Sequence, residues 1–218
     1  MAALPLTLSL LAAASAAGTL WAEHRGARRA FYLLKPLTTV LILALAATAP
    51  APVWSGYRAL VCAGLLFSLA GDVFLMLPRD RFVAGLASFL VAHLFYIAAF
   101  APRPLRLAAP LVLVVLLAYG VVLLRGLWPR LGGLRAPVAV YAAVLLVMAW
   151  QAAARWAVED GGRALLAGLG AGLFVVSDSV LAWERFRERR PYGQAVVLGT
   201  YYAAQWLIAL SVQAVPFG

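Results

Sequence analysis

Long apolar runs, broken at regular intervals by short polar or proline-rich segments, dominate this chain. The runs predict helices near residues 4–22, 33–50, 56–77, 83–100, 105–124, 136–156, 163–183 and 192–214. A helix needs about 20 mostly apolar residues to cross a bilayer, and only helices and closed barrels satisfy their backbone groups in lipid. The runs show little strand-like alternation. We therefore expect an all-α, multi-pass transmembrane bundle of about eight helices, forming one domain over residues 1–218.

The composition agrees with a membrane protein. Hydrophobic residues make up 65% of the 218 residues and charged residues only 12%, whereas a soluble domain is about half apolar and a quarter charged. The net charge of +10 comes from basic residues in short loops, a pattern typical of topology signals and headgroup contacts rather than of nucleic-acid binding. Cys62 is the single cysteine, which excludes an intrachain disulfide. We expect no metal site, no cofactor and no nucleic-acid partner.

The basic residues also predict the orientation. Thirteen of the 18 lysines and arginines lie in or beside the loops after the first, third, fifth and seventh helices, and five, including Arg103 and Arg106, lie near the other loops. By the positive-inside rule the first group faces the cytoplasm, and both termini face outward. The N-terminal run lacks the basic start of a secretory signal, so we interpret it as a retained helix. The expected location is the cell (inner) membrane.

Two acidic residues interrupt the apolar runs. Asp72 lies in LLFSLAGDVFLML and Asp178 in GAGLFVVSDSVLAW, whereas the other six acids, Asp160 among them, lie in or beside loops. A charged side chain deep in a membrane helix costs about 2.5–3.5 kcal/mol on insertion scales. Each acid lies seven residues before an arginine, Arg79 or Arg185, on a helix that runs toward the cytoplasm. The two carboxyls should therefore share one depth, either as structural ion pairs or, as we favour, as functional groups.

Other polar residues lie at a similar depth. Lys35, Thr38 and Thr39 begin the second helix; Ser68 precedes Asp72 by one turn; the remainder are His93, Tyr96, Tyr141, Ser177, Tyr201, Tyr202 and Gln205. Singly, such residues often only join helices, and a lysine can extend to the interface. Their gathering in one half of the bilayer favours a site. With Asp72 aligned on Asp178, weak matches on either side also suggest two parallel four-helix repeats, whose interface is a common place for binding.

Several motifs resemble those of a known family. The segments KPLTT (35–39), FSLAGDVFLML (67–77), FVAGLASFLVAHLFY (82–96), VSDSVLAWERF (176–186) and YYAAQWLIALS (201–211) resemble the YhhN family of eight-helix membrane proteins, whose animal members are lysoplasmalogenases. The similarity covers nearly the whole chain in the same order. It implies hydrolysis of the vinyl ether bond of a lysophospholipid from the bilayer, which gives a fatty aldehyde and a glycerophospho-alcohol.

The residues suit that chemistry. Vinyl ether hydrolysis protonates a carbon and forms an oxocarbenium ion, a cationic transition state like that of glycoside hydrolysis, where two carboxyl groups divide the work. Asp72 and Asp178 would supply one protonated and one ionised carboxyl, in an order that the sequence does not specify. Lys35 is the candidate for the substrate phosphate. Hydrogen bonds to the glycerol or the ether oxygen are expected from the polar set Ser68, His93, Tyr96, Ser177, Tyr201, Tyr202 and Gln205.

A different class of function also fits the pattern. Paired intramembrane acids, a parallel repeat and glycine-rich helices suit a proton-coupled transporter of a small molecule or lipid. An assay separates the two classes: transport can be detected only between two compartments, whereas an enzyme acts in detergent solution. The sequence does not specify the lipid headgroup or the oligomeric state.

Overall fold

A computed structural model describes residues 3–50, 52–102, 108–159 and 161–212; Arg103, Arg106 and Asp160, named above, lie outside these ranges. Within these ranges the chain folds into eight α-helices. These are α1 (Ala3–His24), α2 (Arg28–Ala47), α3 (Ser55–Met76), α4 (Phe82–Phe100), α5 (Pro110–Leu127), α6 (Arg135–Val158), α7 (Gly162–Phe186) and α8 (Gly193–Leu210), with two 3₁₀ turns, η1 (Trp128–Arg130) and η2 (Gly132–Leu134), between α5 and α6. The predicted all-α fold and all eight helices are confirmed.

Three predicted helix ends were wrong by a turn or more. The second helix begins at Arg28 instead of residue 33, so that Lys35 lies inside it rather than at its start. The fifth begins at Pro110 instead of residue 105 because Ala109 adopts a left-handed conformation, with φ of 52°, and proline is well suited to the first helical position. The eighth ends at Leu210, about a turn before the predicted residue 214.

Seven of the helices, α1 to α7, are long and apolar enough to cross a membrane. The exception is α8, whose middle carries Tyr201, Tyr202 and Gln205. All three side chains are buried, because α8 packs against α1, α2, α3 and α7 in the interior of the bundle. The one helix among the eight described that falls short of this criterion thus packs against four others.

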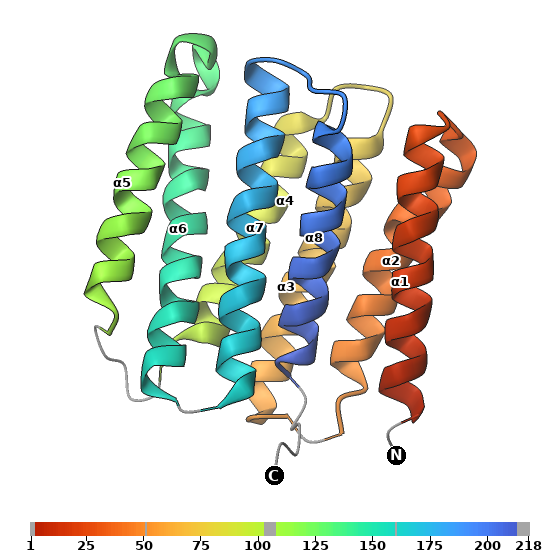
Figure 1. Ribbon diagram of the computed structural model, residues 1–218, viewed down its shortest axis with the longest axis vertical. Helices are drawn as coiled ribbons and strands as arrows, with labels where there is room; N and C mark the ends of the chain where they lie inside the picture. The colour runs from red at the N-terminus through yellow and green to blue at the C-terminus, as the bar shows by residue number, and fades with distance from the viewer. Residues whose placement is uncertain (1–2, 51, 103–107, 160, 213–218) are drawn as a thin grey trace.

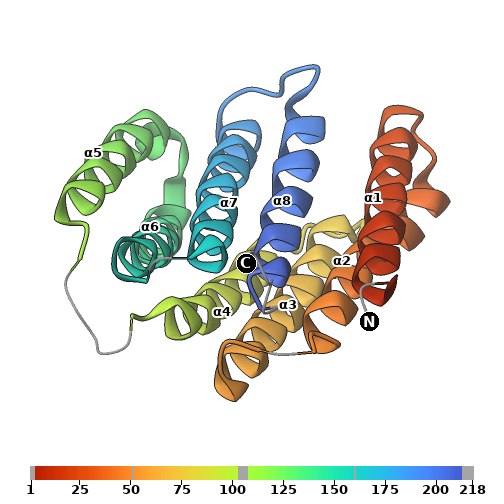
Figure 2. The same ribbon diagram turned by 60° about the horizontal axis from the view of Figure 1, so that its bottom comes forward.

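The connections α1–α2, α3–α4, α5–α6 and α7–α8 all lie at one end of the bundle, and both termini lie at the other (Figure 1). We call the first end the basic end, because most of the arginines lie there. Helices α3 and α7 both run toward it. Seen from below, α5 lies at the margin beside α6 (Figure 2). The two-repeat arrangement remains a prediction.

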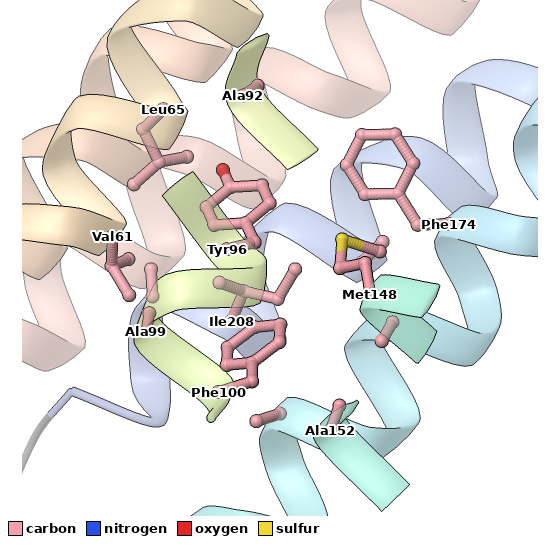
Figure 3. Close-up of a cluster of buried hydrophobic side chains, with 14 of the residues drawn as sticks. Val61, Leu65, Ala92, Tyr96, Ala99, Phe100, Met148, Ala152, Phe174 and Ile208 are labelled. Atoms are coloured by element: carbon pink, nitrogen blue, oxygen red, sulfur yellow. The ribbon is translucent and has the colours of Figure 1, made fainter. Parts of the chain in front are cut away.

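A hydrophobic core fills the bundle away from the basic end. Figure 3 shows side chains from α3, α4, α6, α7 and α8 converging there, among them Leu65, Phe100, Met148, Phe174 and Ile208. All five side chains are fully enclosed. The cavity that both intramembrane acids line opens at the other end of the bundle.

Candidate active site in the basic half of the bundle

A cavity of about 850 Å³ opens at the basic end between α2, α3, α4, α7 and α8, and both Asp72 and Asp178 line it. We call this cavity the vestibule. Its walls also carry Lys35 and Tyr201 at depth and the apolar side chain of Phe89. Both acids thus border the same space; their equal depth remains a prediction.

Asp72 is buried, with 2% of its surface exposed, and its carboxylate has three partners. The Lys35 ammonium lies 3.5 Å from Oδ1. The hydroxyls of Thr39 and Tyr201 each donate a hydrogen bond of 2.7 Å to Oδ2. A buried charge is tolerable when it is paired and its remaining lone pairs are hydrogen-bonded. These partners, drawn from α2, α3 and α8, favour the ionised form of the Asp72 carboxyl.

The glycine of the GD motif explains how α3 and α4 meet beside Asp72. A Cβ atom on Gly71 would lie 2.6 Å from the Phe89 ring, closer than two carbon atoms can approach. Glycine therefore lets Phe89 pack against α3 and form part of the vestibule wall. In the SD motif, Ser177 donates a 3.0 Å hydrogen bond to the carbonyl of Val197 and joins α7 to α8 next to Asp178.

Asp178 has a simpler environment. The Tyr141 hydroxyl donates a hydrogen bond to its Oδ2. Within the described residues, no lysine, arginine or histidine forms an ion pair with it. Its side chain is only partly buried. A carboxyl in apolar surroundings without a cation favours its neutral form.

A second, narrow cavity of about 60 Å³ begins at Asp178. We call it the apolar chamber; it lies between α4, α5, α6 and α7 and, apart from Tyr141, Asp178 and Ser179, is lined by apolar residues. It shares Leu75, Phe82, Phe89, Asp178 and Leu181 with the vestibule. Of these two cavities, Asp72 lines only the vestibule, whereas Asp178 lines both the vestibule and the apolar chamber.

Arginines surround the mouth of the vestibule. We call Arg28, Arg81, Arg185, Arg189 and Arg190 the mouth arginines; all five line the cavity. Arg185 is paired with Asp80, and this hydrogen bond lowers the pKa of the Asp80 carboxyl below its usual value. Sequence reasoning treated these arginines as topology signals and headgroup contacts and did not place them in the site. The run ERFRERR (184–190), which begins in the last turn of α7, the helix that carries Asp178, was the signal that pointed to them.

The ten predicted site residues fall into three groups. Lys35, Asp72, Ser177, Asp178 and Tyr201 line the vestibule. Ser68, His93, Tyr96 and Gln205 are buried and do not belong to its lining. Tyr202 borders a different groove between α1, α2 and α8, where its hydroxyl lies 3.5 Å from the carbonyl of Lys35.

The second group forms a polar layer beneath the vestibule. Tyr96 donates a 2.7 Å hydrogen bond to Oε1 of Gln205. His93 packs edge-on against Phe174 and Tyr141, with ring centroids 4.7 and 5.3 Å apart, and neither ring nitrogen has a hydrogen-bond partner among the residues described. Thr39 and Tyr141, noted in the sequence only for their depth, contact the two acids directly.

Comparison with known proteins gives a consistent result. The family model described as the YhhN family matches residues 30–212. The "Uncharacterized membrane protein YhhN" of Escherichia coli O6:H1 is 36% identical over 192 residues, which cover 88% of this chain and 91% of that protein. No solved structure matches.

Animal enzymes are similar as well. Human "Lysoplasmalogenase TMEM86B" is 41% identical over 156 residues, covering 72% of this chain and 64% of the human protein. Bovine "Lysoplasmalogenase TMEM86A" is 41% identical over 161 residues, covering 68% and 62% of the two chains. This chain thus matches just under two thirds of each animal protein. Its family assignment rests on the match across residues 30–212: the chain belongs to the YhhN family.

Proposed function

We propose that this protein hydrolyses the vinyl ether bond of a lysoplasmalogen-type lipid, with Asp72 and Asp178 as the catalytic residues. The observation that carries the proposal is that two carboxyls with different partners border one cavity, where polar space meets apolar space. Relatives with 41% identity are named lysoplasmalogenases, which supports the same reaction here.

The reaction needs one acidic and one ionised carboxyl. A proton adds to the outer carbon of the C=C–O group and creates an oxocarbenium ion. Water adds to this cation and gives a hemiacetal, which collapses to a fatty aldehyde and a glycerophospho-alcohol. A proton donor and an anion near the cation both lower the barrier, as in glycoside hydrolysis. Two carboxyls in different environments serve these two roles within one site.

The site also suits an amphiphilic substrate. A lysolipid in the leaflet next to the basic end has its phosphate at the level of the mouth arginines and its chain in the apolar region. Lys35 is less suited to the phosphate than the sequence suggests, because its ammonium is 3.5 Å from the Asp72 carboxylate. The mouth arginines replace it in our proposal. By the positive-inside rule, the vestibule faces the cytoplasm and both termini lie outside.

A proton-coupled transporter is the weaker candidate. A carrier needs a route from its central site to both sides of the membrane, and the half of the bundle beyond Phe174 is a packed core that includes Phe100, Met148 and Ile208. The vestibule opens at the basic end, where the mouth arginines lie. One-sided access is sufficient for an enzyme.

An aldehyde-release assay tests the proposal. Purified protein in detergent is given a vinyl ether lysolipid, and the aldehyde is trapped and quantified. The matched control is a saturated alkyl ether lysolipid with the same chain and headgroup, which cannot form the oxocarbenium ion by protonation. We expect aldehyde from the vinyl ether alone. Absence of aldehyde across choline and ethanolamine lysolipids would contradict the proposal, and uptake into sealed vesicles would then favour a carrier.

A further inference from the structure

We propose that the rings of His93 and Phe174 hold in place the two tyrosines that donate hydrogen bonds to the intramembrane acids. We call these two residues the aromatic bridge. This role rests on the proposed function and extends it, because it adds two positioning residues to the same site. Sequence reasoning placed His93 among the hydrogen-bonding partners of the lipid, whereas the structure places its ring between other aromatic rings.

On the side of Asp178 the bridge begins at Tyr141. The Tyr141 hydroxyl donates a hydrogen bond to Asp178. The Tyr141 ring lies edge-on to His93, with ring centroids 5.3 Å apart. His93 in turn lies edge-on to Phe174, with centroids 4.7 Å apart. The group that donates to Asp178 is therefore packed directly against one member of the bridge.

On the side of Asp72 the bridge ends at Tyr201. The Tyr201 hydroxyl donates a hydrogen bond of 2.7 Å to Asp72. Phe174 lies edge-on to the Tyr201 ring, with centroids 5.6 Å apart and an angle of 89° between the planes. Phe89 makes a second perpendicular contact with the same ring, at 5.8 Å. A continuous series of side-chain contacts thus connects the two acids.

The rings of this series come from four helices. His93 lies on α4, Tyr141 on α6, Phe174 on α7 and Tyr201 on α8. Phe174 precedes Asp178 by four residues, so the two side chains lie on one face of α7, and Phe174 also belongs to the core shown in Figure 3. His93 and Phe174 are fully enclosed. Because such an interior is close-packed, a change in one ring shifts its neighbours.

The bridge can affect the reaction without touching the lipid. Neither His93 nor Phe174 lines the vestibule or the apolar chamber. A tyrosine hydroxyl lies at the far end of its ring, so a small tilt of the ring displaces the hydroxyl and the carboxyl bonded to it. Reacting groups must be held to within about 0.5 Å of their productive geometry. Edge-to-face contacts are directional, and the bridge therefore restrains both tyrosines.

His93 serves the bridge through its ring and not through its nitrogens. Both nitrogens are buried, and neither has a hydrogen-bond partner among the described residues. A histidine that transfers protons needs a nitrogen within hydrogen-bond reach of the group that it serves. The contacts that His93 makes with Phe174 and Tyr141 are ring contacts. An aromatic side chain without nitrogens should therefore replace it.

Two substitutions at His93 separate a ring from a hydrogen-bonding group. His93→Phe keeps an aromatic ring and removes both nitrogens, whereas His93→Gln keeps polar atoms and removes the ring. In aldehyde-release assays His93→Phe should keep kcat within about threefold of the wild type, and His93→Gln should lose about tenfold to hundredfold. KM should change little in either variant, because the lining of the cavities is intact. Loss of kcat in folded His93→Phe, or full kcat in His93→Gln, would overturn the proposal.

Phe174 has a matched control elsewhere in the core. Phe174→Leu and Phe100→Leu make the same change at two fully enclosed positions, and the Phe100 ring contacts Tyr57 and Tyr96 instead of the two donor tyrosines. Both variants should lose similar stability in thermal unfolding, but only Phe174→Leu should lower kcat, by about tenfold or more. Equal losses of kcat in both variants, or a loss in neither, would contradict the positioning role.

A measurement on the tyrosines themselves does not depend on activity. Protein labelled with fluorotyrosine gives fluorine NMR signals, and Tyr141→Phe and Tyr201→Phe assign the two that matter. Phe174→Leu should shift both signals: Tyr201 is in direct contact, and Tyr141 is reached through His93. Phe100→Leu should shift neither. A shift of the Tyr201 signal alone would overturn the bridge, whereas shifts of both without aldehyde from any lysolipid would refute the proposed function and leave the bridge standing.

Discussion

Asp72 and Asp178 lie on α3 and α7, which both run toward the basic end, and both line the vestibule, yet their surroundings differ. Asp72 has a cation and two hydroxyl donors and is buried. Asp178 has one tyrosine donor and borders an apolar chamber. The difference teaches that two identical side chains on one cavity wall have different charge environments because their neighbours differ. In a medium with few charges, the position of a single lysine is enough to separate them.

Removal of either carboxyl should have the largest effect. Asp72→Asn and Asp178→Asn keep the size of the side chain and remove the acid or the anion, so each should lower aldehyde release by about 10²–10⁴-fold. Steady-state assays on variants matched for folded protein by size-exclusion chromatography measure the loss. Full activity in either variant would show that the two acids do not divide the reaction.

Removal of Lys35 should make the surroundings of Asp72 resemble those of Asp178. Lys35→Met leaves a buried carboxylate without its cation, which should cost about 3–5 kcal/mol of the free energy of unfolding. Denaturant unfolding in detergent measures this change. In Lys35→Met/Asp72→Asn no unpaired charge is left, so most of the stability should return. A double variant as unstable as Lys35→Met would mean that the ion pair does not account for the loss.

Of the two tyrosines that donate to the acids, Tyr201 should contribute more to the free energy of unfolding than Tyr141. Tyr201→Phe removes a hydrogen bond to the carboxyl that is paired with Lys35, and a bond to a charged acceptor is worth about 1.5–3 kcal/mol. Tyr141→Phe removes one to a carboxyl without a described ion pair, and a bond to a neutral acceptor is worth about 0.5–1.5 kcal/mol. Thermal unfolding of both variants provides the comparison. Equal losses, or a larger loss in Tyr141→Phe, would argue that Asp178 also carries a charge.

The smallest effect should come from the exposed pair at the mouth. The Arg185 hydrogen bond lowers the pKa of Asp80, so the pair is formed above the ordinary carboxyl pKa and is lost as the pH falls through the lowered value. Asp80→Asn should change aldehyde release by no more than about twofold at neutral pH, because exposed ion pairs contribute little. A much larger loss would indicate that Asp80 positions Arg185 for the phosphate.

The sequence predicted the helices well because apolar length alone specifies a membrane span. It also singled out Asp72 and Asp178, which both line the vestibule, since an acid inside an apolar run is costly and therefore conspicuous. The partners were harder to predict. Tyr141 and Thr39 become significant only when α6 meets α7 and α2 meets α3, and Tyr202 shares its helix with Tyr201 but faces another groove. Helix rotation and pairing depend on packing that one sequence does not specify.

Isotope incorporation from solvent tests the central claim most directly. The wild-type protein hydrolyses a vinyl ether lysolipid in D₂O, and the aldehyde is reduced at once to the alcohol to prevent later exchange. If a carboxyl protonates the outer vinyl carbon, mass spectrometry should find one deuterium on the carbon next to the former aldehyde. No aldehyde, or an aldehyde without deuterium at that carbon, would contradict the account.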